Sequence, residues 1–205
     1  MSSQEIHPAL PGSKGEHEMQ QQFQTQEKAK DFYNRQMLDH LAPAMQTFIA
    51  QQEMVFISTS DKHGECDCSF RSGEAGFITV IDENRVVYAD YKGNGVLASA
   101  GNISENPHIG MLFVDFFNDK VGLHVNGKAR ILDEKALLTI VKKSQYDDLV
   151  SVETSSKQKT VFWVLVQVEE AYIHCSKNIP VFKKNDDPSQ MNKGRPIDYF
   201  GLSDS

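Results

Sequence analysis

The spacing of hydrophobic residues changes near residue 53, from a helical period to short apolar runs separated by turn residues. Before this point strong helix formers dominate, and the segment between Met19 and Gln52 predicts two helices. Their candidate buried positions are Phe23, Phe32, Met37, Leu38, Leu41 and Phe48. Pro43 lacks a backbone donor, so we expect a helix to end, restart or kink there.

The rest of the chain has the texture of strands. Runs rich in Val, Ile, Phe and Tyr, bounded by turn residues, are typical of an antiparallel barrel or sandwich. We expect strands at residues 54–59, 66–70, 76–81, 85–91, 109–116, 121–132 and 161–174. Asp61 and Gly64 favour a tight reversal between the first two of them, because both residues accept turn geometry at little cost.

Three other segments break the strand rhythm. Small residues at helical spacing predict a short helix over residues 96–103, which should end before Pro107. An acidic first turn predicts a second helix over residues 133–143. Residues 147–159 are expected to form a solvated loop, because their carboxylates have no spacing that pairs them for acid–base work.

The length of 205 residues suits one domain with some decoration. We expect a flexible arm at 1–16, a helical extension at 17–52, a barrel domain at 53–178 and an irregular tail at 179–205. The polar opening lacks the pattern of a signal peptide, and no apolar run is long enough to cross a bilayer. These features predict a cytoplasmic protein without a membrane partner.

Composition narrows the class of partner. Hydrophobic residues make up 40% and charged residues 24% of the chain, which is ordinary for a globular protein. The net charge of -7 argues against nucleic acid as a ligand, because neutralising its phosphates needs clustered Lys and Arg. The cysteine count of 3 is odd, which favours reduced, buried thiols in a cytosol.

Two short segments carry candidate chemistry. In Ser69-Phe70-Arg71-Ser72-Gly73-Glu74, a guanidinium flanked by hydroxyls and a glycine can bind a phosphate, although a solvated loop has the same composition. In Tyr91-Lys92-Gly93-Asn94-Gly95, the glycines allow a ligand close to the backbone before a helix start, although ordinary turns share this pattern.

Several short blocks of residues, taken in their order along the chain, indicate a protein family more specifically than either segment alone. They are Ser69-Phe70-Arg71-Ser72-Gly73, Gly76-Phe77-Ile78, Lys92-Gly93-Asn94, Asn102-Ile103, Asn106-Pro107, Gly110, Leu112-Phe113, Val125-Asn126-Gly127 and Ala129. In this order they resemble the flavin-nucleotide-binding branch of the pyridoxamine 5'-phosphate oxidase-like proteins. The resemblance covers about half the chain, and His174-Cys175-Ser176-Lys177 resembles a further block.

This resemblance implies a mainly β, α+β fold: a six-stranded antiparallel split barrel that forms a homodimer with two FMN sites at the interface. Arg71 and Lys92 would be the cations that contact the phosphate or the ring. The other implied site residues are Ser69, Phe70, Ser72, Phe77, Ile78, Thr79, Tyr88, Asp90, Asn94, Gly95 and Asn102. Phe77, Ile78 and Tyr88 would line the ring's bed, Asn102 would tie down the short helix, and Lys120 or His124 would reach across from the partner chain.

The chain also departs from the family pattern. Gly95 stands where a basic residue is common, so the phosphate ligands would be fewer or rearranged. The authentic oxidase has an ending rich in Arg and Trp, whereas this chain ends with Arg195-Pro196-Ile197-Asp198-Tyr199-Phe200 and five further residues. We therefore do not expect the activity of the authentic oxidase.

Other groups have less specific interpretations. Cys66 and Cys68 face the same side of a strand, and with His63 and His174-Cys175 they form a candidate metal site that the spacing does not favour over isolated thiols. His108 and His124 lie within predicted strands, where structural hydrogen bonding is as good an explanation as catalysis. Trp163 is assigned to the barrel core or a dimer interface.

The leading hypothesis is an FMN-dependent oxidoreductase that acts on a small molecule and needs no catalytic side chain, because the cofactor carries the chemistry. The alternative is a protein that stores or senses flavin, or that binds haem through His63, His124 or His174. A third interpretation is a dimeric scaffold with an empty cleft.

Overall fold

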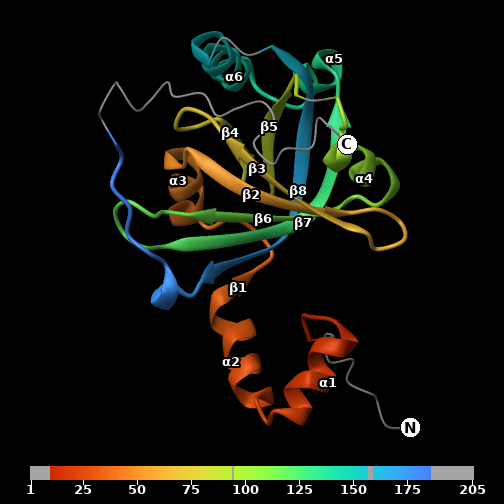
Figure 1. The fold of residues 1–205 in the computed structure, drawn as a ribbon, viewed down its shortest axis with the longest axis vertical. Coiled ribbons are helices and arrows are strands. Elements are labelled where there is room, and N and C mark those ends of the chain that lie inside the picture. The colour runs from red at the N-terminus through yellow and green to blue at the C-terminus, as the bar shows by residue number, and fades with distance from the viewer. Residues whose placement is uncertain (1–9, 94, 157–158, 186–205) are drawn as a thin grey trace, which may run out of the picture.

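The alternating apolar runs form one antiparallel sheet that curls into a barrel (Figure 1). The structure is a computed structural model that describes residues 10–93, 95–156 and 159–185, with residues 152–156 described by their backbone only. The strands are β1 (Met37–Leu38), β2 (Met54–Ser60), β3 (Cys66–Ser72), β4 (Ile78–Asp82), β5 (Arg85–Tyr91), β6 (His108–Val114), β7 (Gly122–Leu132) and β8 (Thr160–His174). Their order is β3-β2-β6-β7-β8-β5-β4, and β1 pairs with β8.

The described sheet has eight strands, not the six that the resemblance implies. All seven predicted strands are present, within a few residues of the expected bounds. The additional strand, β1, lies inside the segment predicted to be helical. Its residue Met37 pairs with Tyr172 of β8, so backbone pairing outweighs the local helix propensity there.

Between residue 10 and β2 the structure contains three helices, where the hydrophobic spacing predicts two. They are α1 (Lys14–Gln22), α2 (Gln26–Gln36) and α3 (Pro43–Gln51). Pro43 begins α3, where its missing N–H would have had no partner in any case. The helix α1 begins inside the predicted arm because the Ser13 hydroxyl accepts a hydrogen bond from the Glu16 N–H at 3.1 Å.

Two hydrophobic clusters hold the sheet together. The larger fills the barrel and includes Val55, Ile57, Tyr88, Phe113 and Val166. The second lies on the other side of β5 and β8, beneath α5 (Glu134–Leu138) and α6 (Lys143–Ser156). Both faces of β5 are therefore buried at residues 86–89, and both faces of β8 at residues 163–166, which explains the continuous apolar runs there. Trp163 is buried as predicted, in the second of these clusters.

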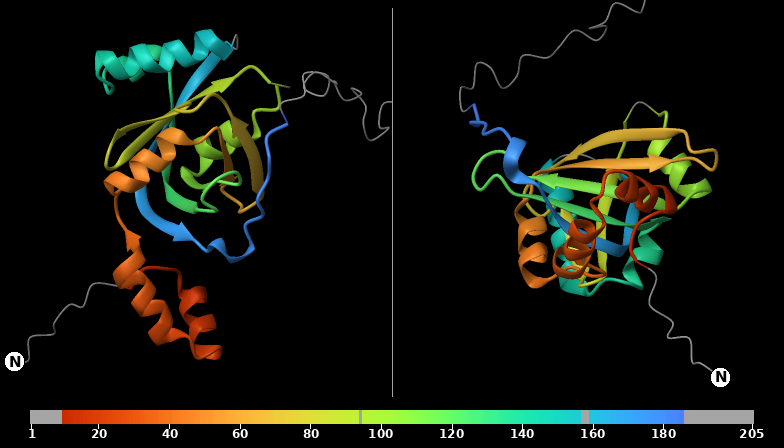
Figure 2. Two further views of the ribbon diagram at one scale, coloured as in Figure 1. Left: turned by 90° about the vertical axis from the view of Figure 1, so that its left-hand side faces the viewer. Right: turned by 90° about the horizontal axis from the view of Figure 1, so that it is seen from below.

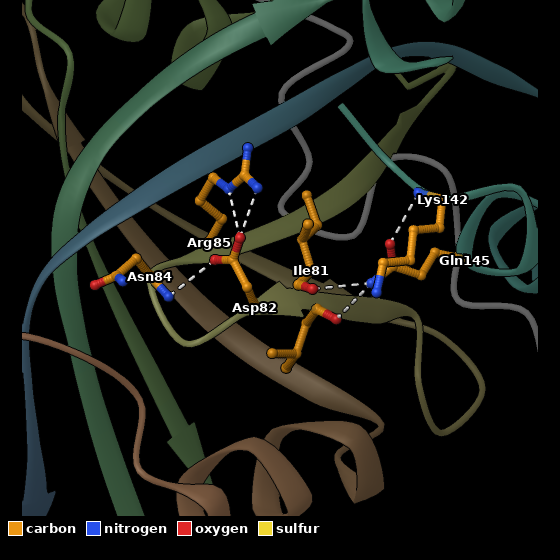
Figure 3. A network of polar contacts seen from close by, with 7 residues as sticks. Ile81, Asp82, Asn84, Arg85, Lys142 and Gln145 are labelled. Atoms are coloured by element: carbon orange, nitrogen blue, oxygen red, sulfur yellow. Dashed lines mark hydrogen bonds and ion pairs between the residues drawn. The ribbon is translucent and has the colours of Figure 1, made fainter. Parts of the chain in front are cut away.

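The prediction of a solvated loop at residues 147–159 is wrong, because residues 147–156 form most of the helix α6. The buried side chain of Leu149 packs into the second cluster and anchors this helix. The amide of Gln145 adds hydrogen bonds to the carbonyls of Val80 (3.4 Å) and Ile81 (2.9 Å) on β4, as Figure 3 shows. Tertiary packing thus stabilises a helix that the local composition does not predict.

The α1–α2 hairpin projects from the end of the barrel opposite α5 and α6 (Figures 1 and 2). It is connected to the sheet through β1, and the ring of Phe32 contacts that of Tyr172 edge to face at 5.7 Å between centroids. Within the described residues, no helix has the length and apolar character needed to span a membrane.

The bulge between Asn126 and Gly127 in β7 generates the first prediction. A methyl group on Gly127 would lie 2.0 Å from the Gln167 carbonyl oxygen, so Gly127→Ala should lower the free energy of unfolding by about 2 kcal/mol or more. Gly101→Ala is the matched control: its methyl has no neighbour within 4 Å, so its stability should be equal or higher. Urea denaturation measures both. Equal stabilities would show that the bulge accommodates a methyl group.

Candidate functional site

The two segments singled out in the sequence meet at one pocket. It has a volume of about 550 Å³ and lies between edge strand β3, the loop that follows β5, and the start of α4 (Ala98–Glu105). The predicted site residues Ser69, Arg71, Asp90, Lys92 and Gly95 all line it. Because β3 and the β5–α4 loop are about 20 residues apart in sequence, only the tertiary structure brings these groups together.

Arg71 is held in place by the protein before any ligand binds. Its Nη2 donates to Oδ2 of Asp90 at 3.1 Å, and its Nη1 donates to the Phe70 carbonyl at 3.2 Å. The side chains of Arg71 and Asp90 are 26% and 15% exposed, so the ion pair is partly shielded from water. Nε of Arg71 is buried and has no hydrogen-bond partner among the described residues.

Tyr88 lies beneath this ion pair. Its side chain is buried in the barrel, and its hydroxyl has no hydrogen-bond partner among the described groups. Burial raises the pKa of Tyr88 far above its ordinary value, while the charge of Arg71 lowers it and that of Asp90 raises it. The hydroxyl is therefore protonated and faces the electrostatic field of both charges.

The opposite wall of the pocket is a loop with unusual backbone geometry. Gly95 has a φ of +85°, and Leu97, which directly precedes α4, has a φ of 55°. The left-handed conformation is uncommon for leucine and costs energy that the surrounding structure must offset. Lys92 is exposed at the mouth of the pocket, and its ammonium group has no partner among the described residues.

A hydroxyl–carboxylate cluster at the foot of the pocket was not predicted from the sequence. Oδ2 of Asp67 accepts hydrogen bonds from the hydroxyls of Ser69 at 2.9 Å and Ser99 at 3.0 Å. Ser99 is buried at the start of α4, so the cluster joins that helix to β3. The alternation of side chains along a strand could have indicated this cluster. Asp67, Ser69 and Arg71 are spaced two residues apart, so they lie on the same face of β3.

Strand geometry separates other predicted site residues from the pocket. Phe70 and Ser72 alternate with Ser69 and Arg71, so they lie on the outer face of β3. The side chains of Phe77, Ile78 and Tyr88 belong to the barrel core, which leaves their backbone as the part able to contact a ligand. Thr79 lies on β4, where its hydroxyl is 3.5 Å from the Gly76 carbonyl.

The remaining predicted residues fall in three places. The amide of Asn102 donates to the Thr59 hydroxyl at 3.1 Å and thereby ties α4 to β2, which is the role expected for it. Lys120 is exposed in the loop between β6 and β7, and His124 lies on β7, both outside the pocket. Asn94 lies outside the described residues.

His124 and His174 are in direct contact on neighbouring strands. Nε2 of His124 lies 2.8 Å from Nδ1 of His174, and the ring of His124 stacks on that of Tyr172 at 4.7 Å between centroids. Burial lowers the pKa of His124 below its ordinary value, and the nearby His174 lowers it further. His63 lies in the turn between β2 and β3, where its N–H donates to Asp61.

The prediction of buried thiols is wrong. Cys66, Cys68 and Cys175 are all exposed, because the first two occupy the outer face of the edge strand β3. No three His, Cys, Asp or Glu side chains of the described residues are close enough together to hold a metal ion.

A larger pocket of about 630 Å³ lies on the outer face of the sheet. Its lining includes Cys66, Cys68, His108, Asn126 and Glu170, and none of the predicted cofactor residues. It shares only Asp67 with the first pocket. We assign the candidate site to the smaller pocket, because that one gathers the cations and the glycine-bearing loop.

The chain thus folds as an antiparallel barrel with a pocket that is lined by Arg71 and Lys92 and lies at the start of a helix. The family model described as pyridoxamine 5'-phosphate oxidase matches residues 41–175. The chain therefore belongs to this family, within the pyridoxamine 5'-phosphate oxidase-like split-barrel superfamily. No curated protein matches the chain.

Solved structures with a similar fold include three with informative descriptions. HupZ of Group A Streptococcus is 18% identical, covering 64% of this chain and 92% of that one, with a TM-score of 0.49. An FMN-binding protein from Syntrophomonas wolfei is 12% identical (78% and 98% covered, TM-score 0.47). HutZ, the haem storage protein of Vibrio cholerae, is 14% identical (65% and 93% covered, TM-score 0.44). Similarities this remote do not assign a ligand to this chain.

The histidine pair generates a prediction about acid stability. Because the folded state lowers the pKa of His124, the unfolded chain binds its proton more readily as the pH falls below about 6.5. The stability linked to His124 is therefore present above that pH and is lost below it. The urea concentration at the unfolding midpoint should decrease when the pH is lowered from about 7.5 to about 5.5. In His124→Gln this decrease should be smaller. The control His108→Gln should show the same decrease as the wild-type protein. A smaller decrease in His108→Gln than in His124→Gln would contradict the assignment of this pH dependence to His124.

Proposed function

We propose that this chain is an FMN-dependent oxidoreductase that acts on a small molecule. The observation that carries the proposal is the meeting of Arg71 and Lys92 at one pocket, beside a glycine-bearing loop at the start of α4. Two cations and backbone N–H groups at a helix start suit the phosphate of a flavin nucleotide. Membership in the family supports this choice of cofactor.

The residues present fit such a cofactor. Lys92 forms no ion pair with a carboxylate of the described residues, and Arg71 keeps a buried Nε without a partner among them. These two side chains would hold the phosphate, while Asp90 keeps Arg71 in position. Bound FMN would supply hydride or electron transfer, and the protein would bind the flavin, orient it and exclude water. We place this activity in the cytoplasm.

A second copy of the chain would complete the site. On the outer face of β2 and β3, the rings of Phe56 and Phe70 lie 5.5 Å apart and are 36% and 51% exposed. Exposed aromatic pairs of this kind are typical of protein–protein interfaces. We therefore propose a homodimer that uses this face, to which Lys120 and His124 of one protomer would contribute near the flavin of its partner.

The first test concerns the cofactor itself. Purified protein should be yellow, and denaturation should release a compound with the mass of FMN. Colourless protein that does not bind added FMN would overturn the proposal.

The second test concerns the cations. Lys92→Met removes an exposed charge without disturbing the core, and it should weaken FMN binding about tenfold, as measured by flavin fluorescence. Lys143→Met removes the same charge from α6, where Lys143 pairs with Asp147, and should leave FMN affinity unchanged. Arg71→Ala, combined with Asp90→Asn so that no carboxylate loses its partner, should weaken binding as well. Unchanged affinity in both pocket variants would remove these cations from the site.

The third test concerns the dimer. Phe70→Glu places a charge on the proposed interface, and light scattering after size exclusion should show that it converts a dimer to a monomer. Leu138→Glu is a matched control at a similarly exposed leucine on α5 and should remain dimeric. A wild-type monomer, or a dimer that survives Phe70→Glu, would contradict the proposed interface.

The contact between His124 and His174 favours a second candidate, a haem-binding or storage protein. A neutral imidazole is a haem ligand, and burial keeps His124 neutral near pH 7. Here the purified protein would show one intense band near the violet end of the spectrum, and His124→Ala or His174→Ala would abolish it.

A further inference from the structure

The hydroxyls at the foot of the pocket face a carboxylate. An ionised carboxylate only accepts hydrogen bonds, so the hydroxyls of Ser69 and Ser99 must both donate to Asp67. Each hydroxyl carries a single proton, and both protons are used in these contacts. The Ser99 hydroxyl also lies within hydrogen-bond distance of the Ser69 oxygen, at 3.2 Å, so its proton has two acceptors, both of them within the cluster. Toward a ligand, Ser69 and Ser99 therefore present lone pairs instead of donors.

Asp67 adds further acceptor capacity at the same place. Both of its hydrogen-bond donors, Ser69 and Ser99, contact Oδ2, and no described residue donates a hydrogen bond to Oδ1. The pocket thus has two ends of opposite character. One end is formed by the cations Arg71 and Lys92, and the other by the acceptor cluster of Asp67, Ser69 and Ser99.

A ligand that matches both ends carries an anion and a group of hydrogen-bond donors. Phosphate, being a dianion or monoanion with acceptor oxygens, suits the cations and is repelled at Asp67. Hydroxyl groups suit Asp67, because a charged acceptor forms a stronger hydrogen bond than a neutral one. A phosphorylated polyol has both features on one short chain.

We propose that Asp67 is a specificity-determining residue that accepts hydrogen bonds from the hydroxyls of a polyol phosphate whose phosphate lies at Arg71 and Lys92. This inference rests on the proposed flavin function, for which it identifies the ribityl hydroxyls as the groups in contact with Asp67. It also assigns Ser69 a different role from that of a hydroxyl that helps Arg71 to bind a phosphate, because Ser69 and Ser99 hold the Asp67 carboxylate in place.

The test compares two ligands on two proteins. One ligand is FMN, and the other is a flavin whose side chain is a pentyl phosphate without hydroxyls. In wild-type protein the loss of the hydroxyls should weaken binding at least about tenfold. In Asp67→Asn, which keeps the size of the side chain, this penalty should shrink by about tenfold. Any change in repulsion of the phosphate affects both ligands equally and cancels in the ratio.

Asp148→Asn is the matched control, because it makes the same change of charge on the exposed surface of α6. It should keep the wild-type ratio of dissociation constants. Wild-type protein that does not bind FMN would overturn the proposed function and this inference with it. Wild-type protein that binds FMN, with a ratio that Asp67→Asn leaves unchanged, would overturn the inference alone.

Discussion

The register between β2 and β3 is the constraint on which the candidate site depends. In this register Thr59, Ile57 and Val55 lie opposite Asp67, Ser69 and Arg71. Paired residues in an antiparallel sheet point to the same face, and the side chains of Ile57 and Val55 are fully buried in the barrel. A slip of one residue would turn the three polar side chains outward and move Cys68 and Phe70 inward.

The turn between the two strands helps to fix this register. The side chain of Asp61 accepts hydrogen bonds from the N–H groups of His63 and Glu65 at 2.8 and 2.9 Å. Gly64 has a φ of +87°, which glycine adopts without the steric cost that other residues incur. Because β3 is an edge strand, one side of its backbone is free of the sheet, and the polar face turns toward α4 and the β5–α4 loop.

The candidate site contains charges of both signs. Arg71 and Lys92 share one pocket with Asp67 and Asp90, and Asp90 is paired with Arg71 at 3.1 Å, so the two cations do not contribute equally to the charge of the pocket. Asp90 holds Arg71 through a partly buried ion pair, whereas Lys92 remains exposed. In such a pocket, the position of each ligand group matters more than the total charge, because the cations lie at one end and the Asp67 carboxylate lies at the other.

Features that depend on local interactions could be predicted from the sequence, whereas features that depend on contacts between distant residues could not. Strands and the β2–β3 turn were predictable because alternation and turn chemistry are local signals. The helix α6 was not, because it is stabilised by the burial of Leu149 and by the contact of Gln145 with β4. The exposure of Cys66 and Cys68 was missed for a related reason: alternation shows that two residues share a face, but not whether that face is covered.

The family, the strand pattern and the two cationic segments could all be inferred from the residues alone. Each of these features depends on residue types and on short spacings along the chain, which determine the local conformation. Which of those residues meet depends on the folded chain, because the pocket joins β3 to a loop and a helix start that come later in the sequence. The tertiary structure also placed Ser99 beside Asp67, 32 residues away, and so reversed the polarity expected of the Ser69 hydroxyl. A hydroxyl donates or accepts according to its neighbours, and those neighbours exist only once the chain has folded.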